Sequence, residues 1–460
     1  MRIRKYIGTK EFYKTVLAIA IPIMIQNGIS QFVSVLDNLM VGRLGTEQMS
    51  GVAIVNQLLF VFNLAVFGAI SGPGIFTAQF VGQKNHEGVR YTVRYKLYAC
   101  IGITVLGVII LMGFQDALIN LFLTESDTDI SIADTLMYAK DYLHVMLTGL
   151  IPFAITSSYA GTLRENGETK LPMYAGLIAV GVNLIGNYIL IFGHFGAPEM
   201  GVVGAAIATV ISRYVEMVIV IVWTHTHTEK NEFAVGLYSS FAIPAKLAKD
   251  ITIKGLPLVL NEFLWSLGMS TVTQCYSTRG VDVIAAFNIS NTIVNLFNVA
   301  MISMGTVVAI VIGQILGSGN VDEVEDTDRK LIAFAIMLSA TLGLILIFTA
   351  PLFPMFYNTT DDIRLMAGKL MRIAACFMPV SAYLNAAYFT IRSGGKTLIT
   401  FLFDSAFLWV VSVPVAFVLS RFTSIAILPM YVVVLALDFI KVTIGAIMLK
   451  KRIWIQNLVG

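Results

Sequence analysis

Long apolar stretches separated by short polar connections run along the whole chain. A bilayer core about 30 Å thick requires about 20 apolar residues of helix, and twelve stretches of that kind lie between charged residues. Their approximate bounds are residues 15–42, 51–81, 97–115, 142–163, 171–193, 202–224, 255–277, 284–316, 331–355, 373–391, 397–420 and 426–449. This pattern predicts an all-α membrane protein with twelve transmembrane helices.

Two of these stretches are longer than a membrane requires. No charged residue lies between Glu47 and Lys84 or between Asp282 and Asp322, so we expect the second and eighth helices to be tilted, bent or re-entrant at one end. The Gly-Pro-Gly sequence at residues 72–74 predicts a bend in the second helix, because proline interrupts helical hydrogen bonding.

Lysine and arginine are distributed unevenly between alternate connections. The set that includes the N-terminus carries 22 of them and the opposite set carries 7. Because cytoplasmic loops are enriched in these residues, we expect a multi-pass protein of the cytoplasmic membrane with both termini in the cytoplasm. The longest connection between helices, residues 225–254, would then be a cytoplasmic linker between two halves, residues 1–224 and 255–460.

The two halves resemble each other in sequence. At an offset of 235 residues, without a gap from residue 22 to 89, the shared positions include Pro22/Pro257, Gly45/Gly280, Asn56/Asn291, Gln79/Gln314 and Gly82/Gly317. A second register, at an offset of 228, pairs Thr162 with Thr390, Arg164 with Arg392 and Arg213 with Lys441. An even number of helices precedes the second copy, so both copies enter the membrane in the same direction. This predicts two parallel six-helix repeats around a central cavity, a geometry that permits alternating access.

Composition excludes several classes of function. The chain is 57% apolar and only 13% charged, which is not typical of a soluble enzyme. Its net charge of +3 is scattered, so we expect no nucleic-acid partner. No P-loop, nucleophile elbow or paired metal-ligand spacing occurs. We therefore predict a protein that is not an enzyme and has no cofactor.

Charged residues inside a membrane are costly and are candidates for function. Seven fall within the predicted spans. Four of them form couples three residues apart, which we interpret as structural ion pairs on one helix face: Arg213 with Glu216, and Asp438 with Lys441. The other three are acids with no basic residue within a helical turn: Asp37, Glu262 and Asp404.

Asp37 is the strongest candidate for binding a cation. It lies near the outer end of the first helix, and Asn183 and Asn187 share a face of the fifth helix at a similar depth. One carboxylate with amide oxygens can hold a proton or a desolvated Na⁺, a hard cation that prefers oxygen ligands. We expect no other metal site.

Glu262 and Asp404 are candidates for a second site. Each lies eight residues after a lysine at a predicted inner boundary, so both belong to one depth of the second half. Adjacent carboxylates can share a proton and exchange it for a cation. Weaker candidates for lining a substrate cavity are the amides Asn56, Gln57 and Asn291.

Three motifs together resemble the MATE family of multidrug and toxic compound extrusion transporters. They are residues 35–45 (VLDNLMVGRLG), residues 183–193 (NLIGNYILIFG) and residues 201–209 (GVVGAAIAT), the last followed by Ser212 and Arg213. The resemblance covers essentially the whole chain. It implies two six-helix lobes around a V-shaped cavity, and export of organic cations driven by Na⁺ or H⁺.

The resemblance also assigns roles to individual residues. Asp37 matches the acid of the family's first helix, and Asn183 matches a polar residue of the fifth. Asn187 stands where many members have aspartate, which removes one ionisable group. Glu262 resembles an acid that one branch of the family has on its seventh helix. On the tenth helix that branch has an aspartate where this chain has Ser381, and we expect Asp404 to compensate.

The sequence thus predicts an antiporter that exports small organic cations across the cytoplasmic membrane by alternating access, coupled to Na⁺ or H⁺. A competing interpretation is a flippase for lipid-linked sugars or another amphipathic lipid. A flippase would need cationic residues to hold a pyrophosphate, but the intramembrane charges are five acidic and two basic. Besides its substrates we expect contact with membrane lipids only, as a monomer.

Overall fold

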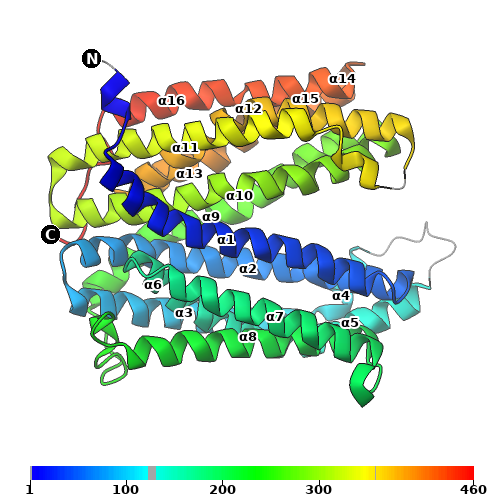
Figure 1. Cartoon of the computed structure of the whole chain (residues 1–460), viewed down its shortest axis with the longest axis horizontal. Coiled ribbons are helices and arrows are strands. Elements are labelled where there is room, and N and C mark those ends of the chain that lie inside the picture. Colours follow the sequence, from blue (N-terminus) through cyan, green and yellow to red (C-terminus); the bar gives the residue numbers. More distant parts are fainter. Residues whose placement is uncertain (1–2, 123–130, 358) are drawn as a thin grey trace. The chain divides into compact units, whose positions relative to one another are not determined.

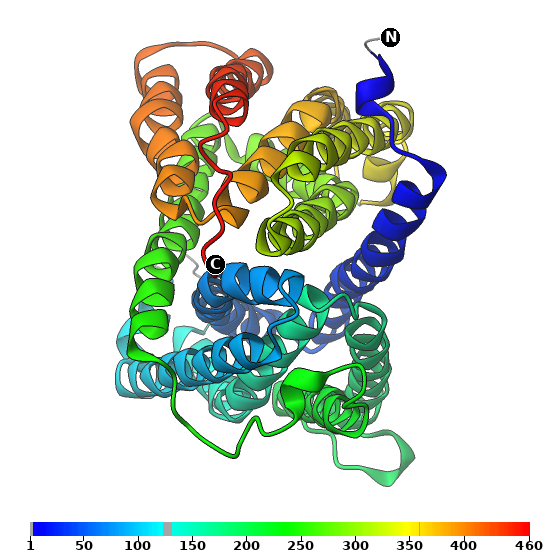
Figure 2. The same cartoon turned by 90° about the vertical axis from the view of Figure 1, so that its left-hand side faces the viewer.

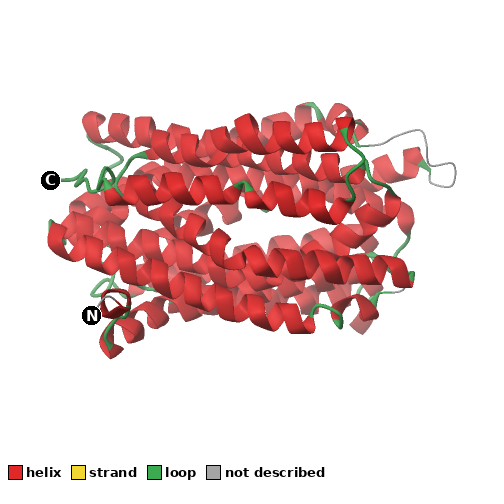
Figure 3. Ribbon diagram, turned by 90° about the horizontal axis from the view of Figure 1, so that it is seen from above, coloured by secondary structure: helices red, strands yellow, loops and turns green. Residues whose placement is uncertain are grey.

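The computed structural model describes residues 3–122, 131–357 and 359–460, which form helices and loops without a strand (Figure 3). The first half contains α1 (Lys10–Val41), α2 (Thr46–Gly82), α3 (His86–Gly113), α4 (Gln115–Asn120), α5 (Ile132–Thr148), α6 (Leu150–Glu165), α7 (Lys170–Phe192) and α8 (Gly201–Thr226). The second half contains α9 (Ala245–Ser277), α10 (Val281–Ser318), α11 (Val321–Thr349), α12 (Asp361–Ser393), α13 (Thr397–Phe401), α14 (Val413–Phe422), α15 (Ile427–Ala436) and α16 (Asp438–Lys450).

Every predicted span coincides with a helical segment. Within the described ranges, ten helices are long and apolar enough to cross a membrane, or eleven with the bent pair α5 and α6. Helix α9 accounts for the remaining predicted span. The chain is therefore an all-α, multi-pass membrane protein, as its hydrophobic pattern predicts.

The pronounced break in a span lies at Gly149. Helices α5 and α6 meet there at 45°, whereas α2 continues through Pro73 as one helix. A side chain at Gly149 would lie 3.0 Å from Val210 and 3.4 Å from Arg213. Glycine at this position therefore lets α8 pack closely against the break.

The chain divides into two compact units, which we describe separately. The N-unit consists of Ile25–Thr77 and Asn85–Thr252, and the C-unit consists of Met1–Met24, Ala78–Lys84 and Ile253–Gly460. The first part of α1 and the last turn of α2 thus pack with the second half of the chain. In the N-unit α7 and α8 lie side by side, and in the C-unit α12 packs against α10 and α11 (Figures 1 and 2).

Each unit buries apolar side chains of its own. Val55, Leu143 and Leu150 belong to the core of the N-unit and are fully or almost fully buried. Leu370 and Met371 belong to one core of the C-unit. These contacts hold the helices of each unit in place, because burying apolar side chains and packing them closely stabilise a bundle.

The repeat is visible in the packing of the C-unit. An added side chain at Gly82 would collide with the backbone of Gln314, and one at Gly317 would collide with the backbone of Gln79. These four residues are two pairs related by the offset of 235. The ends of α2 and α10 therefore cross through equivalent positions of the two copies, which requires glycine on both sides.

The predicted linker is held firmly by the N-unit. The buried Arg94 side chain, on α3, donates hydrogen bonds to three carbonyl oxygens of the linker: Leu237 at 2.8 Å, Gly236 at 3.0 Å and Ala242 at 3.0 Å. The Tyr98 hydroxyl donates another to Phe241 O at 2.9 Å. Residues up to Thr252 accordingly belong to the N-unit.

Candidate functional site

In the N-unit, Asp37 meets the two predicted asparagines of α7. The Asn187 amide donates a hydrogen bond of 2.7 Å to Asp37 Oδ1. Asn183 and Asn187 are only 5% and 2% exposed, and they lie one turn apart on the same face. The structure therefore brings together the three residues that the sequence placed at one depth.

Asn183 contacts Asp37 and a residue that the sequence did not indicate. Turned one way, its amide nitrogen donates to the two carboxylate oxygens of Asp37 at 3.0 and 3.2 Å, while its oxygen lies 3.1 Å from Thr209 Oγ1 on α8. Turned the other way, the Asn183 amide would point its oxygen at the oxygens of the Asp37 carboxylate. Two facing oxygens are stable only with a proton or a cation between them.

The oxygens of this site suit a hard cation. The side-chain oxygen of Asn187 is buried and has no hydrogen-bond donor within the described part of the chain. No lysine or arginine among the described residues forms an ion pair with Asp37. A carboxylate with amide and hydroxyl oxygens is the ligand set that a proton or Na⁺ requires. The residues present therefore fit such an ion.

The C-unit contains a second polar cluster centred on Asn261, which is 2% exposed. Its amide nitrogen donates to Asp404 Oδ2 at 3.2 Å and to the Tyr388 hydroxyl at 3.3 Å. The Ser405 hydroxyl donates to Asn261 Oδ1 at 2.7 Å. The chain around Asp404 forms π-helical turns, Leu402–Ala406 and Leu408–Ser412, a geometry that is frequent at functional sites.

Asp404 has a basic partner, contrary to our prediction. Lys441 Nζ lies 3.1 Å from Asp404 Oδ1, whereas we expected Lys441 to pair with Asp438 on its own helix. Lys441 also lies over the rings of Phe403 and Phe407, 5.5 and 5.8 Å from their centroids. Lys441 also interacts electrostatically with Asp438, but the carboxylate within ion-pair distance belongs to another helix. The prediction missed this partner because it considered neighbours on one helix only.

Glu262 lies in the same cluster as Asp404. Its carboxylate interacts electrostatically with Arg392 and with Asp404. The sequence placed the two acids at one depth but could not tell whether they share a site, and the structure places them together. Two acids are thus accompanied by two bases, Arg392 and Lys441.

The other predicted ion pair also differs. Arg213 donates a hydrogen bond of 3.2 Å to Gly149 O and lies 5.2 Å from the centroid of the Phe153 ring. Glu216 interacts with Arg164 and Arg213, but no ion pair within 4 Å joins it to either one among the described residues. The Gly149 carbonyl also accepts a hydrogen bond of 3.3 Å from Phe153 N, and Arg213 adds a second donor to it at the break between α5 and α6.

The remaining candidates stay predictions. Asn56 accepts a hydrogen bond of 3.4 Å from Tyr142. Asn56, Gln57 and Asn291 are exposed on their units, and Ser381 is partly exposed. These positions are accessible to a ligand, but no contact assigns them to one.

Several buried charges lie outside the predicted spans, among them Lys96 and Asp328. Lys96, on α3, donates to Thr162 Oγ1 at 3.0 Å and pairs with Glu165. Asp328, on α11, is 4% exposed and accepts a hydrogen bond from Thr390. Thr162 and Thr390 are repeat partners at the offset of 228. Lys96 and Asp328 both lie just outside the predicted spans, where a charged side chain is expected to belong to a polar connection.

Apolar helices long enough to span a membrane, in two halves with repeated sequence, are typical of a membrane transporter built from an internal repeat. An acid without an ion-pair partner in the described ranges, Asp37, agrees with this class. The MatE family model matches residues 22–189 and 257–418, two segments whose starts are 235 residues apart. The chain belongs to this family, the MATE transporters.

Curated relatives and solved structures agree with this assignment. The chain is 27% identical to "Probable multidrug resistance protein NorM" of Thermotoga maritima over 93% of this chain and 89% of the relative. It is 25% identical to "Probable multidrug resistance protein YoeA" of Bacillus subtilis, over 90% and 88%.

Among solved structures, the fold matches an outward-facing multidrug resistance MATE transporter with a TM-score of 0.84 at 19% identity, covering 98% of this chain and 97% of that one. It also matches a MOP superfamily transporter from Pyrococcus furiosus with a TM-score of 0.82 at 21% identity, covering 98% and 97%. At these identities the two structures support the fold alone.

Proposed function

We propose that the chain is an antiporter that exports organic cations, including drugs, across the cytoplasmic membrane and takes up Na⁺ or H⁺ in exchange. The observation that carries this proposal is the Asp37 site, where a half-buried carboxylate meets the amides of Asn187 and Asn183. No lysine or arginine in the described part of the chain forms an ion pair with it. The curated relatives are named multidrug resistance proteins, which supports drugs as the class of cargo.

Competition for the charge of Asp37 would couple the two fluxes. A lipophilic cation is attracted to the carboxylate and is released when Na⁺ or H⁺ neutralises it. Neutralisation also allows the Asn183 amide to turn, since its oxygen can then face the carboxylate. The binding of the ion would thereby change the contacts that join α1 to α7 and α8.

The ion gradient supplies enough free energy for export. Exchange of one ion for one organic cation moves no net charge, so the concentration gradient of the ion drives it. A tenfold gradient supplies about 1.4 kcal/mol, which sustains roughly a tenfold concentration ratio of the exported cation. Two parallel repeats that rock about a central cavity would provide alternating access. In this arrangement both termini are cytoplasmic, the transporter acts as a monomer, and lipids are its only other partners.

Reconstituted vesicles test the proposal and choose between the two ions. Wild-type protein is supplied with a Na⁺ gradient or a pH gradient, each imposed separately, and the transport of ethidium is followed by fluorescence. We expect one of the two gradients to drive ethidium against its own gradient. Transport that neither gradient accelerates would refute the proposal.

A lipid-linked sugar flippase remains the second candidate, but the described contacts favour it less. Such a protein needs cationic side chains that are available to a pyrophosphate. In the C-unit cluster Lys441 faces Asp404 and Arg392 interacts with Glu262. Both bases are thus engaged by acids.

A further inference from the structure

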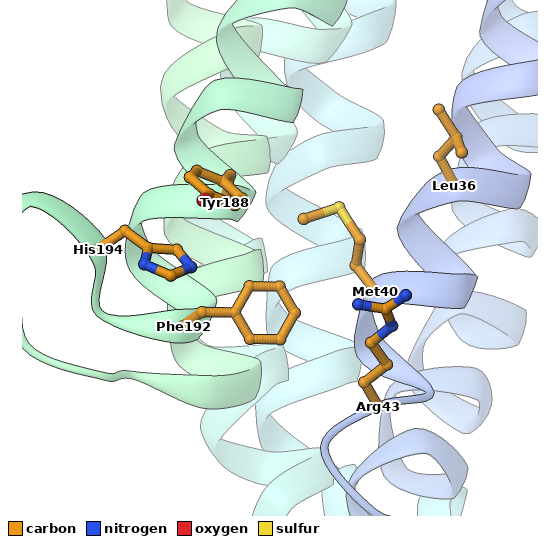
Figure 4. Close-up of a pocket in the computed structure, with 6 residues that line it drawn as sticks. All are labelled: Leu36, Met40, Arg43, Tyr188, Phe192 and His194. Carbon is orange, nitrogen blue, oxygen red and sulfur yellow. The ribbon is translucent and has the colours of Figure 1, made fainter.

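A pocket of about 410 Å³ lies in the N-unit next to the Asp37 site. Its lining consists of Leu36, Met40 and Arg43 from α1 and the turn that follows it, and Tyr188, Phe192 and His194 from the end of α7. Figure 4 shows the Met40 thioether, the Arg43 guanidinium and the Phe192 ring facing one another between the two helices. This volume is in the range of about 300–1,000 Å³ that is typical of pockets for small molecules.

The helical spacing explains how the pocket forms. Leu36 and Met40 lie one turn apart on α1, and Tyr188 and Phe192 lie one turn apart on α7, so each pair presents two side chains on one face. Asp37 follows Leu36, and Asn187 precedes Tyr188. The pocket and the cation site are therefore built on the same turns of the same two helices.

The turn that follows α7 places a third ring, that of His194, at the pocket. Gly193 ends α7 in the left-handed conformation, with φ of 70°, and a side chain there would lie 3.0 Å from Glu199 N. This turn stacks His194 on Tyr188, with ring centroids 4.2 Å apart and an angle of 22° between the planes. Tyr188 nevertheless remains 49% exposed, so the stacked pair presents a flat aromatic surface.

Arg43 determines the charge that this pocket accepts, because it is the one lining residue with a permanent charge. No acid forms an ion pair with it within the described part of the chain. A guanidinium presents two parallel N–H donors that match a carboxylate. Rings alone could also attract a cation, but the positive charge of Arg43 opposes that.

We propose that this pocket binds a flat aromatic anion, with its rings against Tyr188, Phe192 and Met40 and its carboxylate on Arg43. This site goes beyond the proposed export of cations, since its ligand has the opposite charge. Arg43 follows Asp37 by six residues and lies in the turn just after α1. The bound anion and the Asp37 carboxylate would repel each other, so the anion binds more tightly when Asp37 is neutral.

Binding of 2-naphthoate and its neutral analogue 2-naphthamide to the purified full chain tests the proposal. Isothermal titration in low salt should give an affinity about tenfold higher for the carboxylate, a difference of about 1.4 kcal/mol. Arg43→Gln should abolish this preference and leave the binding of the amide unchanged. The matched control is Arg421→Gln, which removes an exposed arginine at the end of α14 and should change neither affinity.

Two further variants complete the test. Tyr188→Leu should weaken both probes, because both stack on the ring, and Asp37→Asn should tighten 2-naphthoate about threefold by removing the repulsion. Equal affinities for the two probes, or an unchanged preference in Arg43→Gln, would overturn the proposal. The rings would then serve as an interfacial aromatic anchor for the loop.

The binding assay needs no ion gradient, so its result is independent of the vesicle experiment. If 2-naphthoate binds as expected while neither gradient changes ethidium transport, the anion site is supported and the proposed antiport is refuted. If one gradient drives ethidium transport while 2-naphthoate shows no preference over the amide, the antiport is supported and the anion site is refuted. The unfolding temperature of each variant identifies any that fails to fold. Because the Arg43 side chain is exposed, Arg43→Gln should unfold at the same temperature as the wild type.

Discussion

The acids of the two units have opposite electrical surroundings. Asp37 faces the amides of Asn183 and Asn187, whereas Asp404 faces Lys441 at 3.1 Å and Glu262 interacts with Arg392. A resident lysine occupies the place beside Asp404 that a mobile cation would take. An acid inside a helical bundle is therefore available for cation exchange only where the fold places no base beside it.

The repeat accounts for this difference. Position 272, which the offset of 235 relates to Asp37, is a valine, so the C-unit has no copy of that acid. Conversely, the offset of 228 relates Lys441 to Arg213 and Asp404 to Gly176. A base occurs at this position in both copies, as Arg213 and Lys441, but the matching acid, Asp404, occurs in the second copy only. Arg213 therefore donates to the Gly149 carbonyl. Duplication preserved the helices and not the charges.

The largest effect is expected from Asp37→Asn. This change removes the one charge for which ion and cargo would compete, so the concentration ratio of ethidium sustained by a tenfold ion gradient should fall from roughly tenfold towards one. Vesicle fluorescence under an imposed gradient measures it. Asp438→Asn, the same change in the C-unit, should retain most of the export. Gradient-driven export by the Asp37 variant would show that its carboxylate is not the coupling site.

The next effect concerns stability rather than transport. Lys441→Met leaves Asp404 without its base, and breaking a buried ion pair costs about 3 kcal/mol. We expect a clearly lower unfolding temperature for Lys441→Met in detergent. In the double variant with Asp404→Asn part of the loss should be recovered, because the charge of Asp404 is then removed together with its base. A single variant as stable as the wild type would mean that water or another group already solvates Asp404.

A third change would make the N-unit site more acidic. Asn187→Asp places a second carboxylate where an amide now donates to Asp37 at 2.7 Å, and two adjacent carboxylates retain a shared proton. We expect export by this variant to depend more steeply on pH and to respond less to Na⁺ than export by the wild type. Transport rates at several pH values, with and without Na⁺, measure both. Unchanged profiles would place Asn187 outside the ion's coordination.

The sequence predicted the helices better than the charge partners. Twenty apolar residues between charges have few alternatives to a membrane helix, so all twelve spans coincide with helical segments. Asp37, Asn183 and Asn187 could be associated because depth along a helix follows from residue count. The Lys441–Asp404 contact and the π-helical turns around Asp404 depend on how helices pack sideways, which residue count does not determine.

The smallest effect is expected at Thr209, which distinguishes a ligand oxygen from a structural one. Thr209→Val removes the hydroxyl that lies 3.1 Å from the Asn183 oxygen, a loss of about 1 kcal/mol and roughly fivefold in affinity for the coupling ion. Thr224→Val is the matched control, since both hydroxyls also donate to a carbonyl one turn earlier on α8, Thr209 at 3.0 Å and Thr224 at 2.7 Å. The ion concentration for half-maximal ethidium export should therefore rise in the first variant only. An equal rise in both would mean that Thr209 supports α8 and does not contribute to the site.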